Sequence, residues 1–207
     1  MTYASAFALW TIMTAIMMVP VVAPWLRAVH GIESGFDDRQ GGRPSPNARR
    51  LPVTAGFTAG YAAAWLAFSA AAAALQWGLS GLGLTFPLLS RGGAAAGLPL
   101  MLVGAYQFTE IKNRCLSKCR SPMGYFMAHW RPGGLGGLSM GVGHGLHCLG
   151  CCWALMLLAL VVGHMHPVWM VVLMGVMVFE TVLPGGQRMV RPLGAGLLIA
   201  GLAVLFV

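Results

Sequence analysis

Long apolar segments, separated by short polar ones, occupy nearly the whole chain. A helix needs about 20 residues to cross the roughly 30 Å of hydrocarbon in a bilayer, and six segments come near or exceed that length. The pattern predicts an all-α, polytopic membrane helix bundle of about six transmembrane helices. We expect a single integral membrane domain over residues 1–207, with spans at 4–26, 53–77, 95–113, 136–162, 166–183 and 190–207.

The composition supports this prediction. The 207 residues are 57% hydrophobic and 9% charged, whereas soluble proteins carry about 25% charged residues. The first segment is expected to be a span rather than a cleavable signal, because it lacks a basic start and runs into Pro20 and Pro24. The sequence has no Gly-rich phosphate loop, no Ser-His-Asp set and no dinucleotide-binding pattern. A binding or transfer role is therefore favoured over catalysis, and no catalytic residue is assigned.

The distribution of basic residues predicts the orientation. Twelve of the thirteen Lys and Arg residues fall in the first, third and fifth connections, and only Arg91 falls in another. Cytoplasmic loops carry the excess of positive charge in membrane proteins, so both termini are expected outside and the odd-numbered connections in the cytoplasm. Loops facing anionic lipid account for the net charge of +8, and the lipid bilayer is the expected partner rather than nucleic acid.

Residues that bind metals concentrate on the fourth segment. At about 100° per residue, His144, Cys148 and Cys151 lie within one narrow arc, and His147 and Cys152 lie on its flanks. Thiolates and imidazoles on one face suit a soft or borderline cation. The alternative is packing, in which cysteines act as small hydrophobes and glycines allow close helix contact. Packing explains the glycines better than it explains two histidines at bilayer depth, so we predict a metal site.

A second pair of thiols, Cys115 and Cys119, follows the third segment. Their four-residue spacing places them on one helix face if that segment continues through them. Neighbouring Lys and Arg residues are expected to lower the thiol pKa values, which suits the capture of a thiophilic ion. The alternative is that both thiols are incidental. The odd count of five clustered cysteines favours ligands or inert thiols over disulfide bridges.

Two carboxylates, Glu110 and Glu180, lie near the cytoplasmic ends of the third and fifth segments. Carboxylates inside a membrane are rare, and they usually have a functional partner. We predict that Glu110 faces the bundle interior beside the fourth segment, because Tyr106 and Gln107 precede it by one turn. The alternative for both residues is an interfacial position, paired with Lys112, Arg114 or Arg188.

These motifs resemble a bacterial family of predicted metal-binding integral membrane proteins known as domain of unknown function 2182. The resemblance covers the first and the third to fifth segments, and it rests on Met17-Met18-Val-Pro20, Tyr106-Gln107, Cys119-Arg120-Ser-Pro122, His144-Gly145, Cys148 to Trp153 and Glu180. It implies a protein of the bacterial inner membrane and a metal, foremost copper. It supports as ligands Cys115, Cys119, His144, Cys148, Cys151, Cys152 and Glu180. Two positions depart from the family pattern: His147 is usually aromatic or aliphatic, and Thr181 stands where a Lys usually follows the Glu.

The leading hypothesis is binding and handover of Cu(I). His144, Cys148 and Cys151 would form an inner site, completed by Cys152 or His147, with Cys115 and Cys119 as a cytoplasmic acceptor; zinc is the alternative ion. Any transport would be passive or coupled to a proton through Glu110 or Glu180. Expected partners are a copper chaperone or other membrane subunits.

Two further hypotheses stay open. One is an accessory or structural subunit of a larger membrane complex with no activity of its own, and the other is a cofactor-binding redox subunit. A haem held by two histidines is disfavoured, because every histidine outside the fourth segment lies at a segment end or in a loop: His30, His129, His164 and His166.

Overall fold

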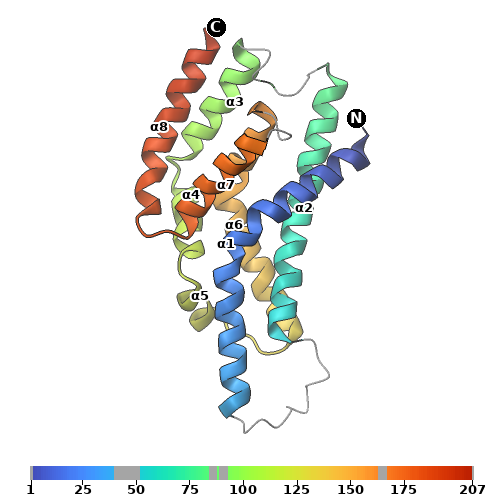
Figure 1. Ribbon diagram of the computed structural model, residues 1–207, viewed down its shortest axis with the longest axis vertical. Coiled ribbons are helices and arrows are strands. Elements are labelled where there is room, and N and C mark those ends of the chain that lie inside the picture. The colour runs from blue at the N-terminus through green and yellow to red at the C-terminus, as the bar shows by residue number, and fades with distance from the viewer. Residues whose placement is uncertain (1, 40–51, 84–87, 89–92, 163–166, 207) are drawn as a thin grey trace.

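The computed structural model describes residues 2–39, 52–83, 88, 93–162 and 167–206, and within them every regular element is an α-helix (Figure 1). The all-α prediction is therefore confirmed for these residues. In chain order the helices are α1 (Tyr3–Arg39), α2 (Val53–Gly81), α3 (Gly93–Tyr106), α4 (Glu110–Cys119), α5 (Pro122–His129), α6 (Gly134–Val162), α7 (Pro167–Thr181) and α8 (Gly186–Leu205). The loop residues Arg43, Arg49, Arg50, Arg91, His164 and His166 lie outside the described residues.

Four helices, α1, α2, α6 and α8, are long and apolar enough to cross a membrane. Helices α3 and α7 are also apolar, but they have only 14 and 15 residues. At 1.5 Å per residue they extend roughly 20 Å, which is less than the hydrocarbon thickness. All six predicted segments thus contain an apolar helix, while the number of membrane crossings stays a prediction.

The third predicted segment, 95–113, is wrong in one respect that matters for the site. Helix α3 ends at Tyr106, and a separate, polar helix α4 begins at Glu110. Between them, the Thr109 hydroxyl accepts a hydrogen bond from the Lys112 backbone N–H and caps the new helix. Because α4 starts afresh, its buried face is not the continuation of the buried face of α3.

Helix α1 extends further than the predicted span, reaching Arg39 rather than residue 26, and it bends near its middle (Figure 1). Pro20 and Pro24 lie within the helix. A proline removes one helical hydrogen bond and crowds the preceding turn, so it bends a helix.

Glycines determine how closely α2 and α6 approach each other. The two helices run in the same direction, and their glycines face the backbone of the opposite helix. A Cβ added to Gly60 would lie 2.2 Å from the carbonyl oxygen of Leu138, and one added to Gly141 would lie 2.1 Å from that of Phe57. Small residues permit this contact between helix backbones, and no larger residue fits at either position.

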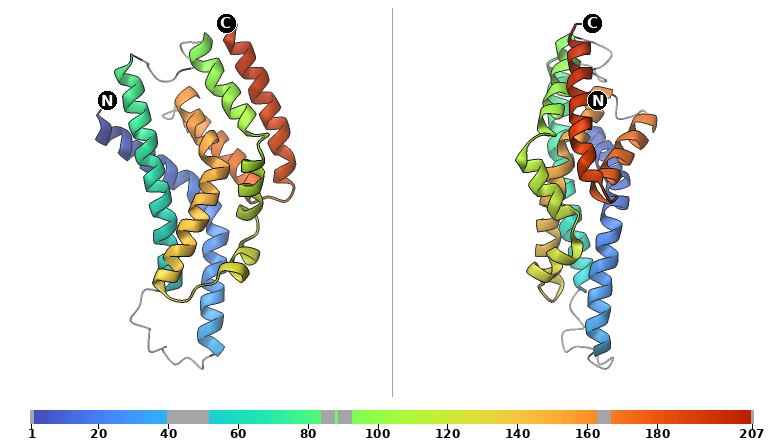
Figure 2. Two further views of the ribbon diagram at one scale, coloured as in Figure 1. Left: turned by 180° about the vertical axis from the view of Figure 1, so that it is seen from behind. Right: turned by 90° about the vertical axis from the view of Figure 1, so that its left-hand side faces the viewer.

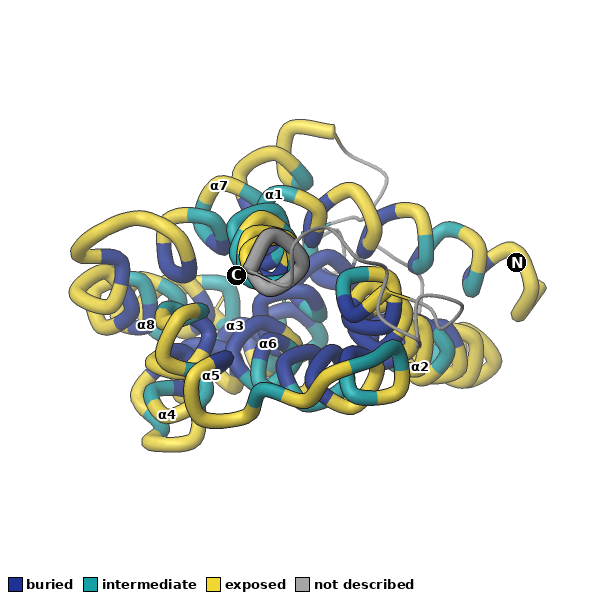
Figure 3. Tube along the Cα trace, turned by 90° about the horizontal axis from the view of Figure 1, so that it is seen from below, coloured by how far each residue is buried: buried dark blue, intermediate teal, exposed yellow. Residues whose placement is uncertain are grey.

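Helix α6 lies in the middle of the molecule, with α2 on one side and α4 on the other (Figure 2). Buried positions gather around it when the molecule is viewed along its long axis (Figure 3). Helices α3 and α8 form a second closely packed pair, with Gly97 against Gly201. Two α6 residues that lie close to α4, Cys148 and Cys151, are buried inside the protein.

Candidate metal centre

Three thiols from two helices converge beside α6. Cys119 comes from α4, and Cys148 and Cys151 come from α6; all three are buried. Their sulfur atoms all lie within 4.8 Å of one another, and the Sγ atoms of Cys119 and Cys151 are 3.7 Å apart. With metal–sulfur bonds of about 2.3 Å, the sulfurs of a three-coordinate site are about 4 Å apart. The spacing therefore suits one ion bound by three sulfurs.

Helix geometry and one long-range hydrogen bond assemble this group. Cys148 and Cys151 are three residues apart on α6, so they share a face of the helix. Cys119 ends α4, and its backbone carbonyl accepts a hydrogen bond from Trp25 Nε1 of α1 at 3.2 Å. The third thiol is thus held against α6 partly by a residue 94 positions earlier in the sequence.

Cys152 and Tyr61 flank the three-thiol cluster. The Sγ atom of Cys152 lies 3.3 Å from that of Cys151, but Cys152 is not within the group of three. The Tyr61 hydroxyl of α2 lies 3.4 Å from Cys148 Sγ and forms a hydrogen bond with it. Tyr61 therefore contacts one candidate ligand from α2.

His144 lies one turn before Cys148, in an aromatic box rather than in the thiol cluster. Its ring stacks on Trp25 with a centroid separation of 3.6 Å, and the rings of Tyr61 and Phe57 follow at 5.5 and 5.8 Å. The side chain is 1% exposed, and Nε2 has no hydrogen-bond partner among the described residues. An unpaired buried nitrogen is a donor available to an ion.

The predicted role of His147 is not supported by its position. Its Nδ1 donates to the carbonyl of Gly143, 2.6 Å away and one turn earlier, and the residue is only half-buried. It does not join the cluster of three thiols. The reason is angular: His147 precedes Cys148 by one residue, and one residue turns the side chain by about 100°.

The structure does not place the two thiols of α4 together as a pair. Cys119 belongs to the inner cluster, whereas Cys115 is half-buried and packs against Gly150 of α6. A Cβ on Gly150 would lie 2.6 Å from Cys115 Sγ. Burial raises the pKa of the Cys115 thiol and Lys118 only partly opposes this, so the expected lowering is wrong.

Glu110 does not face the bundle interior, so that prediction is wrong as well. Its side chain is 82% exposed and forms an ion pair with Arg114 at 2.9 Å, one turn later on α4. The helix break explains this position, because Glu110 is now in the first turn of a new helix. A carboxylate is favoured there by the helix dipole, and nothing requires its burial.

Glu180 is buried, but its partner is a lysine rather than a thiol or a histidine. Its Oε2 atom lies 2.8 Å from Lys112 Nζ, and the two side chains are 1% and 0% exposed. Lys112 also donates a hydrogen bond to the side-chain carbonyl of Gln107. The related family usually has a Lys directly after this Glu, where this chain has Thr181. Here Lys112 of α4 supplies the positive charge instead.

Sequence reasoning missed two residues that shape the centre, Trp25 and Tyr61. Both are aromatic residues within apolar helices, where packing is the ordinary role. Their polar atoms reach Cys119 and Cys148 only because α1 and α2 fold against α4 and α6. Nothing in the neighbouring sequence indicates these contacts.

Buried thiols that converge between apolar helices are suited to binding a soft metal ion. The chain belongs to the PpoB2 family, described as copper chaperone, whose family model matches residues 7–204. Searches of the curated proteins and of the solved structures found no match. The family and the cluster agree on copper handling, and the individual ligands stay predictions.

Proposed function

We propose that this protein is an integral membrane copper chaperone that holds Cu(I) between α4 and α6 and passes it to a partner. The convergence of three buried thiols from two helices carries the proposal. The ligands are Cys119, Cys148 and Cys151. His144 Nε2 is the additional donor, because it is buried, unpartnered within the described residues and one turn from Cys148.

The chemistry favours copper in its reduced state. Thiolates are soft ligands that select Cu(I), and zinc is the main competitor for such a set. Each thiol that binds loses its proton to the solvent, so binding weakens as the pH falls. The transfer is a ligand exchange in which an incoming thiolate replaces an outgoing one, and the copper keeps its oxidation state.

The membrane arrangement is part of the same proposal. The six apolar segments carry the chain across a bacterial inner membrane six times, with the short helices α3 and α7 covering only part of the hydrocarbon thickness; both termini lie outside, and α4 and α5 lie toward the cytoplasm. Support comes from the hydropathy of four helices and from the basic residues gathered in the odd-numbered connections. The resemblance to domain of unknown function 2182 is consistent with this arrangement.

Copper stoichiometry tests the ligand set. The protein is purified in mild detergent under reducing conditions, loaded with Cu(I), and titrated against a chromogenic Cu(I) chelator. We expect the wild type to retain one ion that the triple variant Cys119→Ser/Cys148→Ser/Cys151→Ser does not retain. The variant Cys115→Ser is the matched control, since it removes a thiol of the same helix α4 outside the cluster, and it should bind as the wild type does. Equal copper retention by the triple variant would overturn the proposal.

A further inference from the structure

A second polar cluster lies inside the apolar core, apart from the thiols. It joins Lys112 of α4, Glu180 of α7 and Gln107, which follows the end of α3, and all three side chains are buried. Glu180 Oε1 and Gln107 Nε2 have no hydrogen-bond partner among the described residues. Lys112 is therefore the only described group that compensates the charge of the Glu180 carboxylate, and separating them would leave a buried charge unpaired.

This ion pair lies on the same helix face as a proposed copper ligand. The buried residues of α4 are Lys112, Leu116 and Cys119. Lys112 and Cys119 are seven residues apart, which is about two helical turns, so both point toward the interior from opposite ends of α4. Between them, Leu116 is fully buried and Cys115 is half-buried against α6. The apolar face of this short helix is small, and the polar contacts at its two ends add to it.

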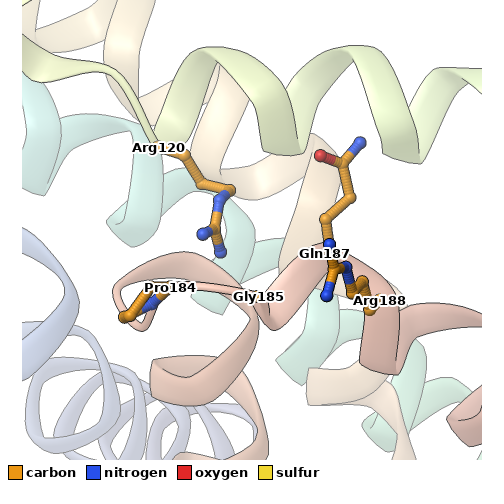
Figure 4. Close-up of a pocket in the computed structure, with 5 residues that line it drawn as sticks. All are labelled: Arg120, Pro184, Gly185, Gln187 and Arg188. Atoms are coloured by element: carbon orange, nitrogen blue, oxygen red, sulfur yellow. The ribbon is translucent and has the colours of Figure 1, made fainter.

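Arg120 fastens the other end of α4 to the same partner helix. Its Nη1 atom donates to the backbone carbonyl of Glu180, and its Nη2 atom donates to that of Leu183 at 2.7 Å. Arg120 extends toward the turn that follows α7, where a cavity of about 500 Å³ is lined by Arg120, Pro184, Gly185, Gln187 and Arg188 (Figure 4). The hydrogen bonds of Arg120 thus join the residue that follows α4 to the end of α7 and to the turn after it.

Both ends of α4 are thus bonded to the end of α7, Lys112 to the Glu180 side chain and Arg120 to the Glu180 backbone. We propose that Lys112 and Glu180, with Arg120, form a clamp that positions Cys119 and thereby sets the number of sulfurs that bind copper. With the clamp closed, the ion has three thiols. With it open, α4 withdraws Cys119 and leaves the two thiols of α6, which release copper more readily. This inference rests on the proposed function.

The test separates a positioning role from a merely structural one. We compare Lys112→Met with the charge-reversed pair Lys112→Glu/Glu180→Lys, using Arg114→Met as the matched control. Arg114 is a cation on the same helix, but its ion pair is exposed. Three quantities are measured: the number of sulfur ligands by X-ray absorption of the Cu(I)-loaded protein, the Cu(I) affinity by chelator competition, and alkylation of Cys119 in the copper-free protein.

We expect Lys112→Met to lower the sulfur number from three to two and to expose Cys119 to alkylation. Its affinity should fall by about 10- to 100-fold, as for the loss of a supporting group around a metal. The charge-reversed variant Lys112→Glu/Glu180→Lys should regain part of the sulfur number, of the Cu(I) affinity and of the protection of Cys119 from alkylation. The control Arg114→Met should match the wild type. If Lys112→Met does not fold, Glu180→Gln removes only the charge, and the same measurements decide. Three sulfurs and a protected Cys119 in these variants would overturn the clamp while leaving the proposed function intact. Absence of thiol-bound copper in the wild type would instead overturn the proposed function.

Discussion

The two halves of α6 use similar small residues for different purposes. In the first half, a Cβ on Gly137 or Gly141 would meet backbone oxygens of α2 at 2.2 and 2.1 Å. One turn further, a Cβ on Gly145 would instead meet the side chain of Ala64, at 2.7 Å. At Cys148, on the same stripe, the neighbour from α2 is the hydroxyl of Tyr61. The contact thus changes from backbone to side chain as the two helices separate (Figure 2).

This difference shows where a metal site has room to form. Two helix backbones in contact leave no space for a ligand side chain between them, so Gly137 and Gly141 in this glycine half of α6 serve packing alone. Where the helices separate, side chains fill the space, and thiols there meet a third helix, α4. The site therefore depends on the glycine half for its position, whereas the glycine half does not depend on the site.

The largest expected effect comes from the glycine half. Replacing Gly141→Leu places a side chain against the backbone of Phe57, which cannot move aside as a flexible side chain would. Overpacking of this kind costs about 1–3 kcal/mol or more, so we expect loss of most folded protein and, with it, of copper binding. The measurement is the monodisperse fraction on size-exclusion chromatography after a heating series.

The control for this change is Gly175→Leu on α7, where an added Cβ meets nothing within 4 Å. It should elute and melt as the wild type does. If Gly141→Leu folds normally and binds copper, the close approach of α2 and α6 is not what positions the site.

A smaller effect is expected from single thiols in the second half. Cys148→Ala should keep the fold, because it removes one sulfur from a buried site, but it should lower Cu(I) affinity by about 10- to 100-fold or more. Cys152→Ala removes an equally buried thiol that lies outside the group of three, and its affinity should stay near that of the wild type. Chelator competition on both variants gives the comparison. Equal losses would mean that Cys152 is also a ligand.

The sequence predicts well those features that depend on one helix at a time. Apolar length predicts the six apolar helices, and the 3.6-residue period places Cys148 and Cys151 on one face of α6. The structure buries four of the five clustered residues, His144, Cys148, Cys151 and Cys152, and leaves His147 half-buried. These properties are local, so the sequence of a single segment is enough to predict them.

Features that depend on how helices meet are not predicted. The break at Gln107–Thr109 starts α4 anew, and it turns Glu110 outward while it brings Lys112 and Cys119 inward. A continuous helix through these residues is equally consistent with the apolar pattern. Likewise, the pairing of Glu180 with Lys112 joins residues 68 positions apart. The sequence allows this pairing as one of several alternatives for Glu180, but nothing in it favours Lys112 over the other basic residues.

The smallest expected effect concerns Cys115, the thiol that packs at the edge of this arrangement. Burial raises its pKa above the ordinary value, and Lys118 opposes this only in part. A raised pKa means a smaller thiolate fraction at neutral pH, so iodoacetamide should modify Cys115 slowly and the rate should increase at higher pH than for a free thiol. The variant Ser117→Cys provides an exposed thiol on the same basic helix for comparison. Mass spectrometry of each peptide over a pH series gives both rates. If Cys115 reacts faster than the thiol at position 117 at pH 7, the basic neighbours outweigh burial, and the contact with Gly150 does not shield the thiol.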